Sequence, residues 1–189
     1  MVHRSRYDEV VDRMSKKYKE LIVRPAIEDG ALGPLISKRQ KSIVEDFISK
    51  GQNLNLVAQG KIDGKSPEKG HYVAPHLFAD VSDDHILAKD EIFGPVQVIM
   101  PFDTEEEAIN IANGTDYGLV ASIWTNDGAR QMRLAKKLKS GQVFINNYGA
   151  GGGVELPFGG RGFSGHGREK GFEALFGFST LKTVASYHQ

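Results

Sequence analysis

The 189-residue chain contains no cysteine. This absence excludes disulfide bonds, thiolate metal sites and a cysteine nucleophile within these residues. No apolar run approaches the roughly 20 residues that a membrane-spanning helix needs, so we expect no membrane partner. The first residues are not followed by an apolar segment of the kind found in signal peptides, which makes the cytoplasm the expected location.

Charge of one sign is not in excess, because Lys plus Arg and Asp plus Glu both count 24. A net charge of zero gives no general attraction to polyanions, and we therefore expect no nucleic-acid partner. Hydrophobic residues make up 40% of the chain and charged residues 25%, which is typical of a globular protein long enough to bury a core.

Histidines at metal-ligand spacing are also lacking, so no metal site is predicted. The six histidines are scattered along the chain and are interpreted as surface residues. They are His3, His71, His76, His85, His166 and His188.

Glycine is abundant instead, with 22 residues, many of them between Gly149 and Gly171. Such a cluster indicates tight turns or a close approach of the backbone to another group. A phosphate-binding loop is the alternative, but the stretch lacks a Gly-Lys-Ser/Thr ending. The segment Gly165-His166-Gly167-Arg168 also lacks the full dinucleotide-binding spacing, so a phosphate site is the less favoured interpretation.

Hydrophobic periodicity predicts alternating helices and strands separated by turns. The spacing of Ser37 and Gln40, and the run that follows Thr104, indicate capping boxes at helix starts. The predicted helices cover residues 6–21, 38–50, 104–112, a segment opening at Asn126 and Asp127 and ending before Gly141, and a short stretch at 168–175. The predicted strands cover residues 54–57, 96–100, 118–124, 142–146 and 180–187, with a polar loop at 60–70.

The order strand–helix–strand–helix–strand between residues 96 and 146 is typical of two right-handed crossovers on a parallel sheet. The sequence therefore predicts an α/β fold with a mostly parallel sheet, flanking helices and a C-terminal extending strand.

Short motifs follow one another along essentially the whole chain. They are Val2-His3-Arg4-Ser5, Gly33-Pro34-Leu35-Ile36-Ser37, Glu91-Ile92-Phe93-Gly94-Pro95-Val96, Asn113 with Tyr117-Gly118-Leu119, Gly141-Gln142-Val143-Phe144-Ile145-Asn146-Asn147, Pro157-Phe158-Gly159-Gly160, Ser164-Gly165, Gly167-Arg168-Glu169 and Leu181-Lys182-Thr183-Val184. This ordered set resembles the C-terminal portion of the NAD(P)-dependent aldehyde dehydrogenase superfamily. The sequence departs from the family pattern at Arg24, where a small residue is usual, and at Arg161-Gly162-Phe163, where a lysine is common.

The resemblance implies a partial catalytic domain over residues 1–178 and an oligomerisation strand over 179–189, with no coenzyme-binding domain. Family enzymes oxidise an aldehyde to a carboxylate with NAD or NADP, and use a cysteine nucleophile and a glutamate base that match no residue here. An unactivated serine is too weak a nucleophile to replace the thiolate. We therefore assign no catalytic residue and expect the chain alone to be inactive. The alternatives are a non-catalytic oligomerising or interaction module, or a truncated remnant.

Three residues are implied to contact the cofactor, although binding by this chain is expected to be weak or absent. The Glu91 carboxylate would accept hydrogen bonds from the nicotinamide ribose, and Phe93 would pack near the nicotinamide ring. Gln40 matches a position near the adenosine ribose. From the residues alone, Glu91 could be a solvated loop residue, Phe93 a core aromatic and Gln40 only part of the cap with Ser37.

The resemblance also implies a substrate pocket for an aldehyde. Phe158 matches a residue that lines the aldehyde tunnel, and residues 148–156, beginning with Tyr148, Gly149 and Ala150, match the loop at its mouth. Because this loop is rich in glycine, we expect a roomy or mobile opening. The resemblance further implies a homo-oligomer formed by strand pairing between residues 142–146 and 180–187 of neighbouring subunits.

Overall fold

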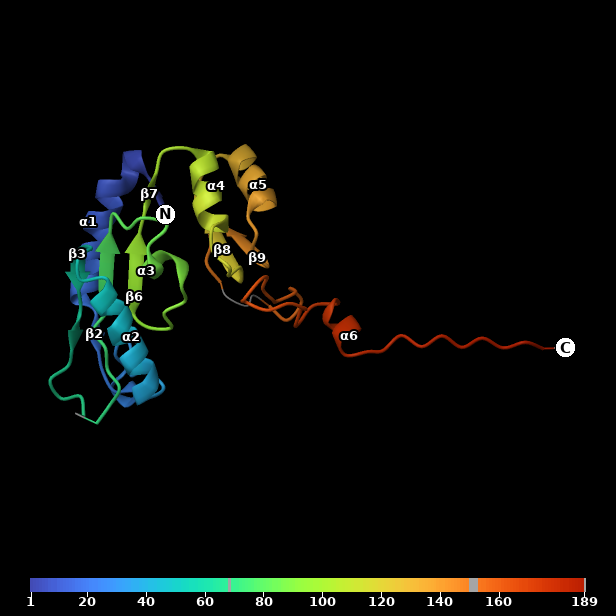
Figure 1. Cartoon of the computed structure of the whole chain (residues 1–189), viewed down its shortest axis with the longest axis horizontal. Helices are drawn as coiled ribbons and strands as arrows, with labels where there is room; N and C mark the ends of the chain where they lie inside the picture. The colour runs from blue at the N-terminus through green and yellow to red at the C-terminus, as the bar shows by residue number, and fades with distance from the viewer. Residues whose placement is uncertain (68, 150–152, 189) are drawn as a thin grey trace. The chain divides into compact units, whose positions relative to one another are not determined.

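The computed structural model describes residues 1–67, 69–149 and 153–188, and its contacts divide the chain into two compact units, Met1–Ala108 and Ile109–Gln189 (Figure 1). In chain order, unit 1 contains β1 (Val2–His3), α1 (Arg4–Glu20), β2 (Ile22–Val23), the 3₁₀ helix η1 (Ala26–Glu28), α2 (Lys38–Lys50), β3 (Asn55–Gln59), β4 (Lys61–Ile62), β5 (His76–Ala79), α3 (Ile86–Lys89), β6 (Val96–Ile99) and β7 (Pro101–Phe102). Helix α4 (Glu105–Asn113) spans the boundary, and unit 2 continues with β8 (Val120–Ile123), α5 (Gly128–Lys137), β9 (Gln142–Ile145) and α6 (Ala174–Gly177).

The main sheet of unit 1 has the strand order β3-β5-β6. Strand β5 pairs antiparallel with β3 and parallel with β6, with His76 opposite Val96. All four residues of β5 are buried, as is typical of a central strand covered on both faces. The interpretation of His76 as a surface residue is therefore wrong. Strand β5 is not among the strands predicted from the sequence.

Two apolar clusters give unit 1 its layers (Figure 1). On one face, Tyr7 and other residues of α1 pack against Leu77 and Ile99. On the other face, Val44 of α2 and Leu87 of α3 pack with Phe78. Successive strand residues point to opposite faces, so neighbouring β5 residues serve the two different clusters. Unit 1 is thus a helix–sheet–helix sandwich.

Helix α2 has the bounds that its sequence predicts, and its ends explain why. The Ser37 hydroxyl accepts a hydrogen bond from the Gln40 N–H at 3.1 Å, which caps the amino end. The helix ends at Gly51, where a Cβ would come within 3.2 Å of the Phe78 ring and 3.0 Å of Leu87. The second half of the predicted capping box is not formed, because the Gln40 side chain binds elsewhere.

In unit 2, parallel strands β8 and β9 are joined by α5, which begins at its N-cap Asp127. The prediction of two crossovers on one sheet between residues 96 and 146 is wrong, because β6 pairs with β5 and β8 pairs with β9 in a separate sheet. Periodicity identifies strands but does not select their partners. The α/β class itself is confirmed, since every strand pair except β3–β5 is parallel among the described elements.

The last part of unit 2 departs from its predicted elements. A helix is predicted over residues 168–175, but the observed helix α6 covers only residues 174–177. Residues 179–188 form neither helix nor strand in the single chain, since no described strand pairs with them. Within the described residues, no helix has both the length and the apolar character needed to cross a membrane.

Candidate functional site

Glu91 and Phe93 lie in a loop whose intervening residue, Ile92, is buried in the apolar core. Ile92 is only 8% exposed and belongs to the cluster that contains Val44 and Phe78. Its two neighbours face outward: Glu91 is exposed, and Phe93 is 71% exposed. The interpretation of Phe93 as a core aromatic is therefore wrong, and the loop presents a carboxylate and an aromatic ring to solvent.

The loop is also fixed at its carboxyl end, where it enters strand β6. The Val96 N–H donates to the Gly94 carbonyl at 2.8 Å, and the His76 N–H donates to the Pro95 carbonyl at 2.8 Å. Gly94 lies so close to Val44 that an added Cβ would overlap both Val44 methyl groups. Glycine is therefore required here by close packing against α2.

Gln40 reaches the same loop from α2. Its side-chain Nε2 donates to the Ile92 carbonyl at 3.0 Å and to the Phe93 carbonyl at 3.2 Å. The capping-box interpretation of its side chain is thus corrected, since the amide binds a segment 52 residues away instead of the helix start. The structure brings together all three residues predicted to contact the cofactor.

The chemistry of this loop suits a ribose bearing an aromatic base. An ionised carboxylate such as Glu91 only accepts hydrogen bonds, so it complements the two hydroxyl donors of a ribose diol. The exposed Phe93 ring offers an apolar face on which a flat heterocycle can stack. The described residues therefore fit the nicotinamide half of a dinucleotide.

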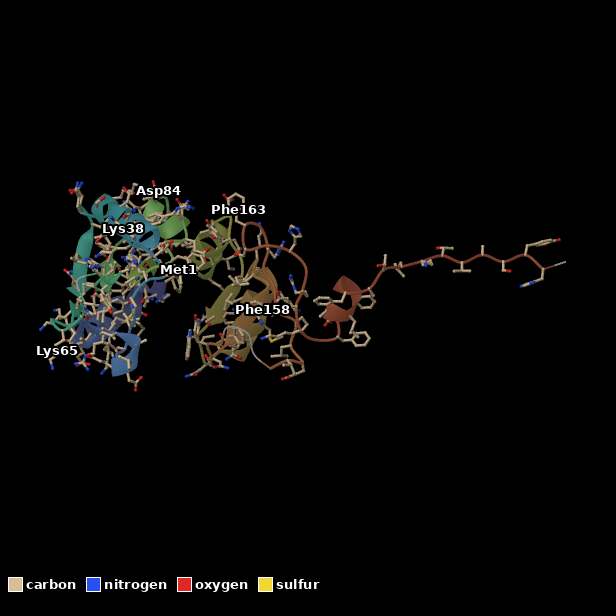
Figure 2. All side chains as sticks on the ribbon, turned by 90° about the horizontal axis from the view of Figure 1, so that it is seen from below. Met1, Lys38, Lys65, Asp84, Phe158 and Phe163 are labelled. Carbon is tan, nitrogen blue, oxygen red and sulfur yellow. The ribbon has the colours of Figure 1, made fainter. Side chains whose placement is uncertain are left out.

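Phe158, the residue predicted to line the substrate tunnel, lies in unit 2 (Figure 2). Its backbone exchanges two hydrogen bonds of 2.7 Å with Glu169, which forms an isolated antiparallel bridge. Its half-buried ring lies beneath the Lys170 ammonium, which is 5.5 Å from the ring centre. Phe158 is therefore held within the loop region by a single antiparallel bridge.

The predicted tunnel-mouth residues lie on the chain just after β9. Tyr148 is 73% exposed, and Gly149 is half-buried, with its nearest side-chain neighbour in Phe144. Ala150 lies outside the described residues. Exposure of Tyr148 is compatible with a place at an opening, and its role as a substrate contact stays a prediction.

The loop that departs from the family pattern is built around Gly118. The carbonyl of Gly118 accepts hydrogen bonds from the Gly141 N–H at 3.0 Å and the Arg161 N–H at 3.1 Å. Its N–H donates to the Ser164 hydroxyl at 3.1 Å. Gly162 has a φ of +59°, a conformation that favours glycine. The unusual residues at 161–163 are thus accommodated by backbone hydrogen bonds that do not depend on their side chains.

The other departure, Arg24, forms an ion pair in unit 1. Its Nε lies 2.9 Å from Asp63 Oδ2. A hydrogen bond from the Lys65 N–H and the charge of Arg24 hold the pKa of Asp63 below its usual value. Arg24 thus tethers the loop after β4. Among the described residues, no group of three or more histidine or acidic side chains could hold a metal ion.

Comparison with protein-family models identifies similarity to the aldehyde dehydrogenase family over residues 1–184. Among curated proteins, the betaine aldehyde dehydrogenase of Rhizobium johnstonii is 38% identical over 180 residues, covering 94% of this chain and 37% of the relative. The betaine aldehyde dehydrogenase of Agrobacterium fabrum is 44% identical over 155 residues, covering 81% of this chain and 31% of the relative. The matched residues thus span only about a third of the length of these relatives.

Solved structures give the same result. A Burkholderia cenocepacia protein classed as an aldehyde dehydrogenase is 55% identical, with a TM-score of 0.93 and coverage of 96% of this chain and 39% of that protein. The NAD⁺ complex of an aldehyde dehydrogenase from Bacillus cereus is 39% identical, with a TM-score of 0.88 and coverage of 97% and 37%.

Proposed function

The chain belongs to the aldehyde dehydrogenase family, and on that basis we propose that it forms the part of such an enzyme that holds the nicotinamide end of NAD(P) and lines the path of the aldehyde. The observation that carries this proposal is the loop at residues 91–95. It presents an exposed carboxylate and an exposed aromatic ring on a backbone anchored by buried Ile92. The NAD⁺ complex formed by the Bacillus cereus relative supports nicotinamide as the chemistry to test.

We assign each residue a role within this proposal. Glu91 accepts hydrogen bonds from the nicotinamide ribose, and Phe93 packs against the nicotinamide ring. Phe158, Tyr148, Gly149 and Ala150 belong to the aldehyde path. When bound, NAD(P) would supply the hydride acceptor, which no side chain can provide.

We further propose that these 189 residues do not oxidise aldehydes on their own. The family reaction starts with a thiolate that attacks the aldehyde carbon, and the sequence contains no cysteine. The division into a partial catalytic domain over 1–178 and an oligomerisation tail over 179–189 is part of the same proposal.

Two measurements on the purified chain test the proposal. With NAD and betaine aldehyde, absorbance at 340 nm should show no NADH above the protein-free rate, and sustained turnover would contradict the proposed inactivity. In an NMR titration, NAD should shift the backbone amides of Glu91 and Phe93 with a Kd of about 1 mM or weaker, because only part of the dinucleotide is held. Glu91→Ala should abolish these shifts, while Asp90→Ala removes the adjacent carboxylate as a matched control and should preserve them.

A second candidate function is oligomerisation, and the C-terminal residues favour it. The side chains of Leu181, Val184 and Tyr187 are 103%, 82% and 86% exposed. In a chain without a partner, these apolar groups stay in contact with water, which is unfavourable in free energy. The sheet of β8 and β9 has only two strands among the described elements, so each strand leaves one edge able to pair. We propose that the tail pairs with such an edge on another subunit.

A further inference from the structure

Phe93 adopts a backbone conformation that costs energy unless its surroundings hold it. Its φ is +52°, in the left-handed region that non-glycine residues rarely occupy. A left-handed residue of this type costs about 1–2 kcal/mol relative to the right-handed form. The ring of Phe93 is 71% exposed, so packing of this side chain cannot supply the restraint. The restraint must come from the backbone and its partners.

The two carbonyls that flank the Phe93 Cα, those of Ile92 and Phe93 itself, accept from one side-chain nitrogen. Gln40 Nε2 donates to them at 3.0 Å and 3.2 Å. A group that binds both carbonyls fixes the peptide planes on either side of Phe93, and hence its φ and ψ. One primary amide has two N–H donors, which is the number that this contact requires.

Helix α2 supports this contact one turn further along. Val44 follows Gln40 by four residues and therefore lies on the same helix face. Val44 is fully buried and lies directly against Gly94, the residue after Phe93. The donor at Gln40 and the apolar contact at Val44 thus hold consecutive parts of one loop, and the Ser37 cap fixes the start of the helix that bears both.

We infer that Gln40 is a positioning residue: its side-chain amide holds the Ile92–Phe93 backbone in the left-handed turn that presents Glu91 and Phe93 outward. Its effect on the turn stands on the structure alone, while its effect on cofactor binding rests on the proposed function. The role differs from direct contact with the adenosine ribose, which the family resemblance implies for the same side chain.

The turn can be tested without ligand by NMR on the full chain. Gln40→Met removes both donors at nearly constant length, and Gln40→Glu replaces them with a carboxylate that repels the carbonyl oxygens. We expect the Ile92 and Phe93 carbonyl carbon resonances to move in both variants, more strongly in Gln40→Glu. Hydrogen exchange at the Val96 N–H should accelerate about tenfold, the order expected when hydrogen bonds of ordinary strength are lost from a local opening equilibrium.

Gln52→Met is the matched control, because Gln52 is an exposed glutamine just beyond the end of α2. It should leave the Ile92 and Phe93 carbonyl resonances and Val96 exchange unchanged. If the Gln40 variants do not fold, the unmodified chain still decides the question, since the Gln40 side-chain amide protons should exchange more slowly than those of Gln52. Unchanged resonances in folded Gln40→Met, or equal exchange of the two side-chain amides, would overturn the inference.

An NAD titration then separates the two proposals. If NAD shifts the Glu91 amide in the unmodified chain, Gln40→Met should weaken the apparent affinity in proportion to the loss of the closed turn, about tenfold where only a tenth of the molecules retain it. Unaltered affinity in a variant whose turn has opened would refute the positioning role. If NAD shifts nothing in the unmodified chain, the proposed cofactor site fails, while the ligand-free measurements still decide what Gln40 does to the turn.

Discussion

The phenol of Tyr7 accepts a hydrogen bond of 2.7 Å from the backbone N–H of Asp80, a residue with a φ of +55°. The same hydroxyl donates to the Ile99 carbonyl at 3.1 Å. One side chain of α1 thus joins the ends of β5 and β6 beneath the sheet. Burial raises the pKa of this phenol above its usual value, so the hydroxyl remains a donor to more alkaline pH than an exposed tyrosine would.

Tyr7→Phe should destabilise unit 1 by about 1–3 kcal/mol, because the buried N–H of Asp80 and carbonyl of Ile99 lose a partner. Urea unfolding followed by circular dichroism measures the change. Tyr18→Phe is the matched control, since the Tyr18 hydroxyl bonds to the Gln97 side chain in a more exposed setting. Its cost should be below about 1 kcal/mol. Equal losses of unfolding free energy in both variants would show that the hydrogen bonds of Tyr7 stabilise the fold no more than that of Tyr18.

Gly94→Ala should cost about 1–3 kcal/mol, because the new methyl group overlaps Val44 in a packed core. Gly33→Ala serves as control: a Cβ there meets no atom within 4 Å, so stability should change by less than about 0.5 kcal/mol. The cost of Gly94→Ala should fall when Val44 is also replaced by alanine. Strict additivity of the two substitutions in urea unfolding would argue against the contact.

Acid should weaken the start of helix α5. A hydrogen bond from the Arg130 N–H lowers the pKa of Asp127 below its ordinary 3.8. Because the folded pKa is the lower one, the stabilisation is complete above the unfolded pKa and is lost as the pH falls through the folded value. Asp127→Asn keeps a capping side chain without a titrating group. The stability of the unmodified chain should therefore decline relative to Asp127→Asn as the pH falls below about 4. Parallel pH profiles of the two proteins would contradict this assignment.

The oligomer should depend on the apolar side chains of the tail. We expect light scattering at micromolar concentration to show a dimer or larger species. Replacing Leu181 and Val184 with lysine should shift it toward monomer, since charges at those positions must be desolvated on pairing. Replacing Thr180 and Thr183 with lysine adds the same charge to the same segment as a control and should have a smaller effect. A stable monomer of the unmodified chain would contradict the proposal.

Elements with two independent signals in the sequence were predicted closely. Helices α2 and α5 have apolar periodicity together with a capping residue, Ser37 or Asp127, and their observed starts follow those caps. Helix α1 begins two residues earlier than predicted because His3 caps it through its ring nitrogen. Histidine is not among the favoured capping residues, so its sequence gave no such indication.

Features that depend on distant partners could not be predicted in this way. Strand β5 is buried on both faces, so it lacks the alternation that marks a half-exposed strand. The family resemblance predicts Glu91, Phe93 and Gln40 as cofactor contacts, but no local pattern connects Gln40 with carbonyls 52 and 53 residues later. Such a contact follows only from the packing of α2 over the loop before β6.

The pairing of β1 with β7 has a consequence for biosynthesis. Val2 lies opposite Pro101, and the ion pair between Arg4 and Asp103 closes the same junction across 99 residues. At about 5–20 residues per second, a ribosome produces the later strand roughly 5–20 s after the earlier one. During that interval β1 and the start of α1 lack the strand and the aspartate that complete this junction, although β3 and β5, against which α1 also packs, are already synthesised.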